Sequence, residues 1–304
     1  MDAATKTLKA DPLDGIQPRT IETRSGPLEC AVFGEGPAVL SLHGAMGGWD
    51  QGALLALTAG VPGHRYLCPS RPGYLGTPLA RDRTPAAQAR RYADLLDALG
   101  VERAAVMAVS GGGPSALRFA IDFPDRCRGA VIVSSVVRRQ DQRLPLAWWV
   151  LRVALRFPPL AEAMRRRSAR DPDAAATRSI PDPAVRARTL AHPEAGPLLR
   201  ALFASTGRRM AERLDGTEND VAVTRGALDL PLERLRVPVL AVHGTSDELA
   251  PFENARELVA RAPRGELLAL DGGRHVAIYT HLEEVRPAVG RFLAAHADEE
   301  EACS

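Results

Sequence analysis

The sequence predicts an α/β fold: a doubly wound, mostly parallel sheet that carries an inserted helical cap. Short apolar segments rich in β-branched residues alternate with amphipathic helical segments along most of the 304-residue chain. This alternation is typical of parallel strands connected by helices on both faces of a sheet. One long interval, residues 138–236, lacks strand patterning and is rich in Arg, Ala and Pro, which indicates helices inserted between two core strands. We therefore expect residues 1–137 and 237–304 to form the core and residues 138–236 the cap.

The strands are predicted from apolar runs bounded by Gly, Pro and charged residues. The first two runs, joined by Gly26 and Pro27, are expected to pair in antiparallel fashion. Runs that are apolar throughout are expected to be buried on both faces of the sheet. The predicted strands are 19–25, 28–34, 37–44, 64–70, 104–109, 129–137, 237–244 and 265–273.

Helical patterns lie between these strands. In the first, Thr84 is the expected N-cap, Pro85 lies in the first turn and Gly100 ends the helix. The predicted helices are 85–99, a helix from Pro114 onward, 253–262 and 282–295.

The cap begins with "LPLAWWVLRVALRFPPLAEAM", residues 144–164, which is apolar on nearly every face except a stripe that holds Arg152 and Arg156. We expect this helix to be buried between cap and core. A helix that also lines a substrate pocket, with Trp148 and Trp149 as contacts, is the alternative. A helix on a membrane surface is a third interpretation, disfavoured because few charges flank it.

Composition limits the classes of function. The chain is 45% hydrophobic with a formal net charge of +2, which does not indicate a nucleic-acid partner. The N-terminus lacks the apolar core of a signal peptide, and no segment is suited to cross a bilayer. We therefore expect a cytoplasmic monomer or homodimer that acts on a small molecule. The four cysteines have no CxxC spacing, and neither HExxH nor a Walker A sequence is present, so we expect free thiols and neither metal nor cofactor. The cysteines are Cys30, Cys68, Cys127 and Cys303.

The segment "MAVSGGGPSAL", residues 107–117, joins a predicted strand to a predicted helix at Ser110. Glycines at such a corner serve either a dinucleotide-binding turn or a nucleophile elbow. The spacing Gly111-x-Gly113-x-x-Ala116 loosely fits the first. However, the following strand ends in "SSVVRR" without the acid that binds ribose, and several strands precede the turn. The elbow, with Ser110 as nucleophile, is favoured.

A serine nucleophile needs a base and an acid, and on this fold they follow it in the order Ser, acid, His. Asp247 follows the strand "VPVLAVHG", and His275 follows the strand "GELLALDGG". Both therefore occupy loops at the carboxyl ends of later strands. Glu248 and Asp271 are the rival acids. Among the other histidines, His43 and His243 precede glycines at strand ends, where a histidine more often bonds to the local backbone, and His281 opens the last helix.

These motifs together resemble the α/β-hydrolase superfamily, from about Arg19 to Ala295. "SRPGYLGTP" and "SGGGP" resemble a bacterial branch of capped serine hydrolases. Ala108 stands where the elbow pattern has glycine, and we expect the added methyl group to be tolerated. The resemblance implies an oxyanion hole formed by the N–H groups of Gly111 and Ala45. Met46 is the alternative second donor and a candidate substrate contact.

The resemblance and the residues together imply a hydrolase that cleaves an ester, thioester or lactone of a small, apolar substrate through an acyl-enzyme. Serine at the elbow disfavours the halide and epoxide chemistry of relatives that use aspartate there. A carbon–carbon bond hydrolase and a cofactor-free acyl transferase remain open with the same triad. A non-catalytic small-molecule sensor on this fold is the alternative from another class.

Overall fold

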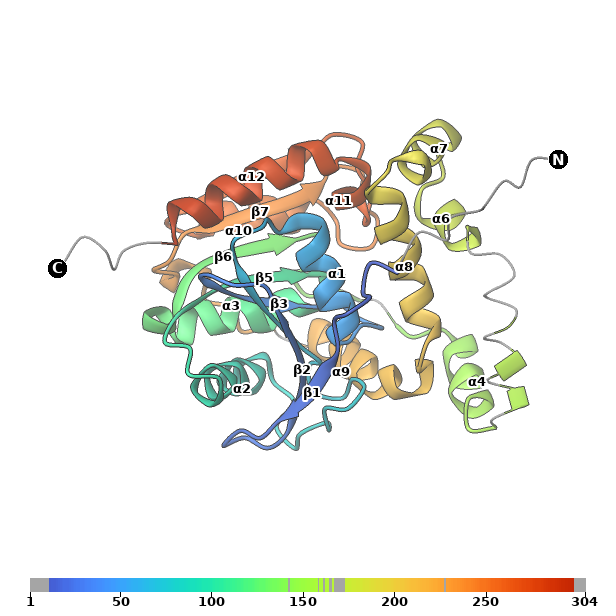
Figure 1. The fold of residues 1–304 in the computed structure, drawn as a ribbon, viewed down its shortest axis with the longest axis horizontal. Helices are drawn as coiled ribbons and strands as arrows, with labels where there is room; N and C mark the ends of the chain where they lie inside the picture. The colour runs from blue at the N-terminus through green and yellow to red at the C-terminus, as the bar shows by residue number, and fades with distance from the viewer. Residues whose placement is uncertain are drawn as a thin grey trace.

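The computed structural model describes residues 11–297, apart from residues 142, 158, 161, 164, 165, 167–172 and 227. In this part of the chain eight strands form one sheet in the order β1-β2-β4-β3-β5-β6-β7-β8 (Figure 1). The antiparallel pairs are β1–β2 and β2–β4, and all other neighbours are parallel. The predicted mostly parallel sheet is therefore confirmed. Its strands are β1 Pro18–Ile21, β2 Leu28–Phe33, β3 Ala38–Leu42, β4 Arg65–Pro69, β5 Ala104–Val109, β6 Cys127–Val133, β7 Val239–Gly244 and β8 Gly265–Leu270.

The order of strands reverses at β3, because β4 lies on one side of it and β5 on the other. Crevices at such a switch point, outside the carboxyl ends of the strands, are the usual ligand sites of open α/β sheets. His43 follows the end of β3, and Ser110 follows the end of β5. The topology alone therefore brings these two loops together.

Helices cover both faces of the sheet. One face packs against α1 Trp49–Ala59, α11 Ala277–Thr280 and α12 Leu282–Ala295, and the other against α2 Pro85–Ala98, α3 Gly113–Asp122 and α10 Glu253–Arg261. The central strand β5 shows why both faces of the sheet are covered. Val106 and Ala108 belong to one hydrophobic cluster, whereas Ala105 and Met107 belong to the other. Successive side chains of a strand point to opposite faces, so a continuous apolar run serves both cores.

Helix α2 begins and ends where its sequence predicts. The Thr84 hydroxyl accepts a hydrogen bond from the Ala87 N–H at 3.2 Å, and Pro85 is the first helical residue. Gly100, just beyond the helix, has a φ of 64°, a conformation that favours glycine.

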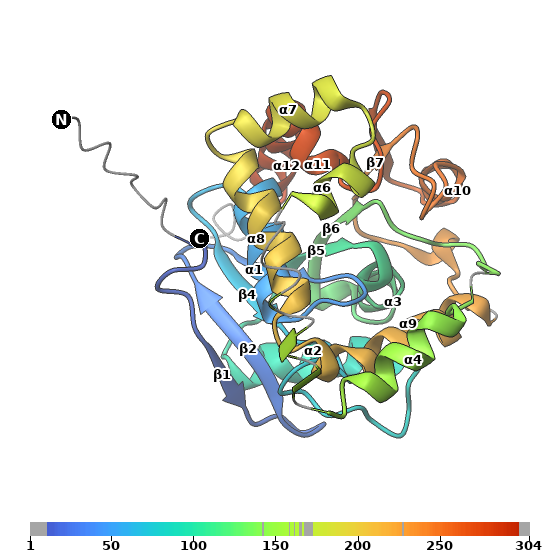
Figure 2. The same ribbon diagram turned by 90° about the vertical axis from the view of Figure 1, so that its right-hand side faces the viewer.

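A helical region between β6 and β7, which we call the cap, lies on the side toward which β5, β6 and β7 point (Figures 1 and 2). Helix α8 packs on α1, and α9 approaches the loop after β4 through the Gly216 N–H, which donates to the Gly73 carbonyl at 2.9 Å. The cap helices are α4 Leu146–Ala154, α6 Ala174–Ser179, α7 Pro183–Ala191, α8 Ala195–Gly207 and α9 Leu214–Arg225. Short 3-10 turns occupy Ser110–Gly112, Pro124–Arg126, Met210–Arg213 and Leu232–Arg234.

The expectation that the first cap helix is buried between cap and core is wrong. No residue of α4 is buried, and Leu146, Val150 and Val153 are 79%, 64% and 54% exposed. The polar side of the helix is the attached one: Arg152 forms ion pairs at 2.8 Å with both Asp215 and Glu218 of α9. Because those ion pairs turn the Arg152 stripe toward α9, the apolar side faces outward.

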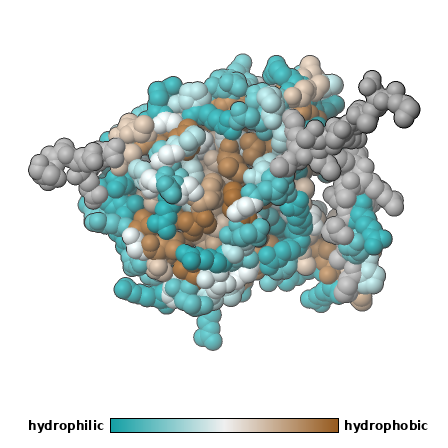
Figure 3. All heavy atoms as spheres, viewed as in Figure 1, coloured by the Kyte–Doolittle hydropathy of each residue, from teal (hydrophilic) through white to brown (hydrophobic). Residues whose placement is uncertain are grey.

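The thiols of Cys30, Cys68 and Cys127 are free and buried, as predicted, whereas Cys303 lies outside the described residues. Within the described ranges no helix is both long and apolar enough to cross a membrane. On the face shown in Figure 3, apolar patches alternate with hydrophilic residues.

Candidate active site

Ser110 occupies the sharp turn between β5 and α3. Its φ of 51° is in the left-handed region, which non-glycine residues rarely adopt and which marks functional sites. A side chain at Gly112 would place its Cβ 2.6 Å from the His43 carbonyl oxygen. The glycine therefore lets the helix start close to the end of β3. The Ser135 hydroxyl donates to the Ser110 carbonyl at 2.6 Å and ties the turn to the end of β6.

Ala108, which replaces the first glycine of the elbow pattern, is completely buried in β5. It remains in register with Leu42 of β3 and Ile132 of β6. The added methyl group therefore fits without breaking the central ladder.

His275 lies in the loop after β8, with its ring between Ser110 and Asp247. Its Nε2 is 3.1 Å from Ser110 Oγ, and its Nδ1 is 2.9 Å from Asp247 Oδ2. A carboxylate at Nδ1 assigns the proton to that nitrogen, which leaves the Nε2 lone pair directed at the serine hydroxyl. The side chain is 24% exposed, so the ring is reachable from solvent.

The Asp247 carboxylate is fully buried and every bond to it favours its charged form. Its Oδ1 accepts the N–H groups of Leu249 and Ala250 at 2.9 and 3.0 Å, and its Oδ2 lies 3.4 Å from His243 Nε2. Burial alone would raise the pKa of this carboxyl, but the hydrogen bonds from His243 and His275 outweigh burial and hold its pKa well below the ordinary value. Asp247 is therefore ionised at neutral pH.

The rival acids lie outside this chain of contacts. Glu248 is 75% exposed and forms an ion pair with Arg274. Asp271 accepts a long hydrogen bond from the Thr245 hydroxyl at 3.4 Å.

The rival histidines are bonded to the backbone, as such positions favour. His43 Nδ1 donates to the Gly44 carbonyl at 2.7 Å, and its Nε2 accepts the Arg71 N–H at 2.9 Å. Burial, with the nearby Arg71 charge, holds the pKa of His43 well below its ordinary value. His243 Nε2 donates to the Ala250 carbonyl at 2.7 Å. Among the predicted residues, the structure places Asp247 and His275 with Ser110. His243 meets this chain of contacts at the acid, with its Nε2 3.4 Å from Asp247 Oδ2.

The two residues predicted to supply an oxyanion hole, Gly111 and Ala45, lie close to each other. A Cβ built on Gly111 would lie 3.4 Å from the Ala45 nitrogen, so the two residues meet beside Ser110. The Met46 N–H, in contrast, donates to the Thr217 hydroxyl at 3.0 Å. Because that N–H is engaged, Met46 is the less suitable of the two candidates for the second donor.

A buried ion pair beside this site was missed by the sequence analysis. Arg71, in the loop after β4, is 1% exposed and donates to both carboxylate oxygens of Asp220 in α9. The Tyr74 hydroxyl donates to the same carboxylate at 2.5 Å. The partners are 149 residues apart in sequence, and the available signal was only an arginine in the otherwise uncharged "SRPGYLGTP".

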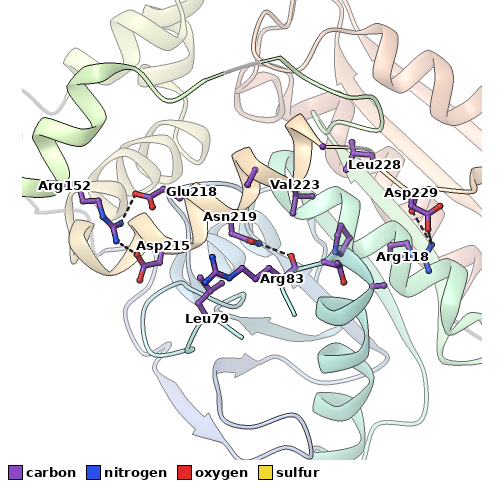
Figure 4. A pocket seen from close by; sticks show the side chains of 15 residues that line it. Leu79, Arg83, Arg118, Arg152, Asp215, Glu218, Asn219, Val223, Leu228 and Asp229 are labelled. Atoms are coloured by element: carbon purple, nitrogen blue, oxygen red, sulfur yellow. Dashed lines mark hydrogen bonds and ion pairs between the residues drawn. The ribbon is translucent and has the colours of Figure 1, made fainter. Parts of the chain in front are cut away.

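A separate cavity of about 830 Å³ lies between α9 and the start of α2 (Figure 4). Neither Ser110 nor His275 is among its described lining residues. Helix α9 separates the two sites. Its successive residues are spaced about 100° apart around the helix axis, so they fall on two opposite sides. The cavity side carries Asp215, Glu218, Asn219, Ala222 and Val223, whereas Thr217 and Asp220 face the core loops.

Neither of the two tryptophans predicted as substrate contacts is placed at Ser110: Trp148 bonds to a residue that lines the cavity, and Trp149 lies on the surface. The Trp148 indole N–H donates to Glu218 at 3.0 Å, and Trp149 is 48% exposed. The apolar character expected for the substrate rested on these two side chains and on Phe157, which is 59% exposed, and the positions of the three give it no support.

Comparison with known proteins agrees with this architecture. Residues 37–282 match the family model described as alpha/beta hydrolase fold. The chain belongs to this family. An alpha/beta hydrolase fold protein from Nakamurella multipartita is 30% identical and superposes with a TM-score of 0.81 over 92% of this chain and 99% of that one.

Curated relatives are more distant or match in part. The uncharacterized hydrolase YcgS of Bacillus subtilis (strain 168) is 35% identical over 120 residues, which are 39% of this chain and 42% of that protein. A 2-hydroxy-6-oxo-6-phenylhexa-2,4-dienoate hydrolase from Burkholderia cepacia is 23% identical over 86% of this chain and 89% of its own.

Proposed function

We propose that this protein is a capped serine hydrolase that cleaves an ester, thioester or lactone of a small molecule through an acyl-enzyme, with residues 138–236 as the cap. The observation that carries the proposal is the continuous chain of contacts from Ser110 Oγ to His275 Nε2, at 3.1 Å, and from His275 Nδ1 to Asp247, at 2.9 Å. The contact with Asp247 also supports the His275 tautomer that a general base needs, with the proton on Nδ1.

In the first half of the reaction, Ser110 Oγ attacks the acyl carbonyl while His275 Nε2 takes the hydroxyl proton. The ionised Asp247 stabilises the imidazolium that results. His275 then passes the proton to the leaving alcohol or thiol as its bond to the acyl carbon breaks. In the second half, His275 deprotonates a water that attacks the acyl-enzyme, and returns the proton to Ser110 as the acid is released.

The negative charge that develops on the carbonyl oxygen is stabilised by the N–H groups of Gly111 and Ala45. Fixed donors at such a position are worth about 10² to 10³ in kcat each in related chemistry. The engaged Met46 N–H supports Ala45 as the second donor.

A carbon–carbon bond hydrolase is the second candidate function. It is favoured by the similarity to the Burkholderia cepacia hydrolase, which extends over 86% of this chain. The same serine, histidine and aspartate would serve it, so the two candidates differ in the substrate and not in the nucleophile.

The test is intact-mass analysis after treatment with a fluorophosphonate, followed by mapping of the labelled peptide. We expect one adduct, on Ser110, that is absent in Ser110→Ala and strongly slowed in His275→Ala. Ser134→Ala is the matched control, because Ser134 follows the end of β6 as Ser110 follows the end of β5, and its buried hydroxyl has no hydrogen-bond partner in the described structure. It should be labelled like the wild type. Folded wild-type protein without an adduct would contradict the proposal and favour a binding protein.

Once Ser110 is labelled, the two hydrolase candidates are separated by substrate. Turnover of p-nitrophenyl esters and lactones without cleavage of a vinylogous 1,5-diketone supports the ester hydrolase. The reverse preference supports the carbon–carbon bond hydrolase.

A further inference from the structure

The first two turns of α9 lie against the loop that carries the proposed oxyanion donor. We call residues 44–48 the oxyanion loop. On the α9 side, Thr217 Oγ1 accepts the Met46 N–H at 3.0 Å and donates to the Arg213 carbonyl at 2.8 Å. Arg213, which precedes the helix, also donates to the Met46 carbonyl at 3.4 Å. The Met46 N–H is therefore held by the cap, whereas its carbonyl is shared between Arg213 and Gln51 of α1, whose Nε2 donates to it at 3.2 Å.

A second connection runs through Arg71. Its Nη2 donates to the Gly44 carbonyl at 3.3 Å, and its backbone N–H donates to His43 at 2.9 Å. Asp220 of α9 holds the guanidinium from the other side at both carboxylate oxygens. Burial alone would lower the pKa of Arg71, but the Asp220 carboxylate outweighs burial and raises it, so the guanidinium stays charged. The residues on both sides of Ala45 are thus fixed, one by Thr217 and one by Arg71 with Asp220.

We propose that Thr217 and Asp220 of the cap are positioning residues that hold the oxyanion loop, and with it the Ala45 N–H, in the geometry that binds the oxyanion. This inference rests on the proposed function. An oxyanion hole stabilises the transition state only when its donors are fixed before the reaction, since a misplaced donor costs rate even where it still binds substrate.

A positioning role of Asp220 and a role through its charge predict opposite effects of its removal on kcat. Its Oδ2 lies against Gly111, 2.8 Å from where a Cβ would be. A carboxylate so close to an oxyanion opposes it by charge, so an Asp220 that acted only by charge would slow the reaction, and its removal would raise kcat. If Asp220 acts by position, its removal lowers kcat.

The experiment compares Thr217→Val with Thr217→Ser and with the control Thr224→Val, using a p-nitrophenyl ester and phenylboronic acid as inhibitor. Thr224 lies on the same helix, and its hydroxyl bonds within that helix to the Asp220 and Val221 carbonyls. We expect Thr217→Val to lower kcat about tenfold with KM within about twofold. The inhibition constant of the boronic acid, whose serine adduct is tetrahedral, should rise by the same factor as kcat/KM falls. Thr217→Ser should restore both.

A Thr217→Val enzyme with unchanged kcat and unchanged boronate inhibition would overturn the inference, as would an equal loss in Thr224→Val. Asp220→Asn is the second variant. We expect it to lower kcat about a hundredfold and to lower the urea midpoint of unfolding. A rise in kcat would show that Asp220 acts through its charge and not by positioning the loop. Fluorophosphonate labelling of the wild type comes first. Absence of labelling means that the proposed function itself has failed, whereas labelled wild type with unaffected variants rejects only the positioning role.

Discussion

Replacement of Asp247 by asparagine exchanges one carboxylate oxygen for an NH₂ group and should disable the proposed general base, His275, without unfolding the protein. Asp247 Oδ1 accepts two backbone N–H groups, at 2.9 and 3.0 Å. An amide nitrogen cannot accept them, so the amide oxygen must stay at that position. The amide NH₂ then faces His275 Nδ1, where it donates, and the histidine proton moves to Nε2.

The resulting tautomer points a proton, in place of a lone pair, at Ser110 Oγ. The equivalent change in other serine hydrolases costs about 10⁴ in kcat, or about 5.5 kcal/mol of transition-state stabilisation at about 1.4 kcal/mol per tenfold. The assay is hydrolysis of a p-nitrophenyl ester, with far-ultraviolet circular dichroism to confirm folding. Glu248→Gln, a neighbouring and exposed carboxylate, is the control and should retain activity within about twofold. An Asp247→Asn enzyme with a tenth or more of the wild-type rate would refute the reasoning.

Three further predictions concern stability, each measured by urea unfolding. His43 is neutral in the fold, and its unfolded-state pKa is near 6.5. As pH falls below about 6.5, the unfolded state therefore binds a proton before the folded state does. The free energy of unfolding then falls by up to about 1.4 kcal/mol per pH unit. His43→Gln should flatten this slope, and an unchanged slope would reject the assignment. Phe119→Ala should lower the free energy of unfolding by about 3 to 5 kcal/mol because its ring is fully buried. Val153→Ala, on the exposed side of α4, should change it by no more than about 0.5 kcal/mol. Equal losses would contradict the difference in burial between these two side chains. Thr84→Ala should cost about 1 kcal/mol by removing the N-cap of α2, and Thr84→Ser should restore most of it.

The sheet was predictable because each of its strands is a local pattern. The run that becomes β5 is apolar on both sides, and the two cores take alternate residues of it. The order Ser110, Asp247, His275 was predictable for a related reason: the fold places loops that follow strands at one edge of the sheet, so the sequence position of each loop determines where its side chain meets the others.

The cap was not predictable in the same way. The α4 segment is apolar enough to be expected inside, yet its attachment depends on Asp215 and Glu218, which lie more than sixty residues later in a segment without pattern. The pair Arg71 and Asp220 is more remote still, because its partners are 149 residues apart. Interactions between single charged side chains leave no periodic pattern, so the sequence showed Arg152 without its partners and gave no sign of the Arg71–Asp220 pair.

The division of the Arg71–Asp220 pair between core and cap has a consequence for how such proteins can be recombined. Arg71 belongs to the core loop and Asp220 to the insertion, and both are buried. A foreign cap grafted onto this core would leave the Arg71 guanidinium buried without its carboxylate, which should lower the free energy of unfolding by about 3 to 5 kcal/mol. The loss would be avoided only if the incoming helix placed an acidic residue at the position of Asp220. Exchange of caps to alter substrate range should therefore succeed only with donors that bring this acid, or when Arg71 is replaced in the same step by an uncharged residue of similar volume.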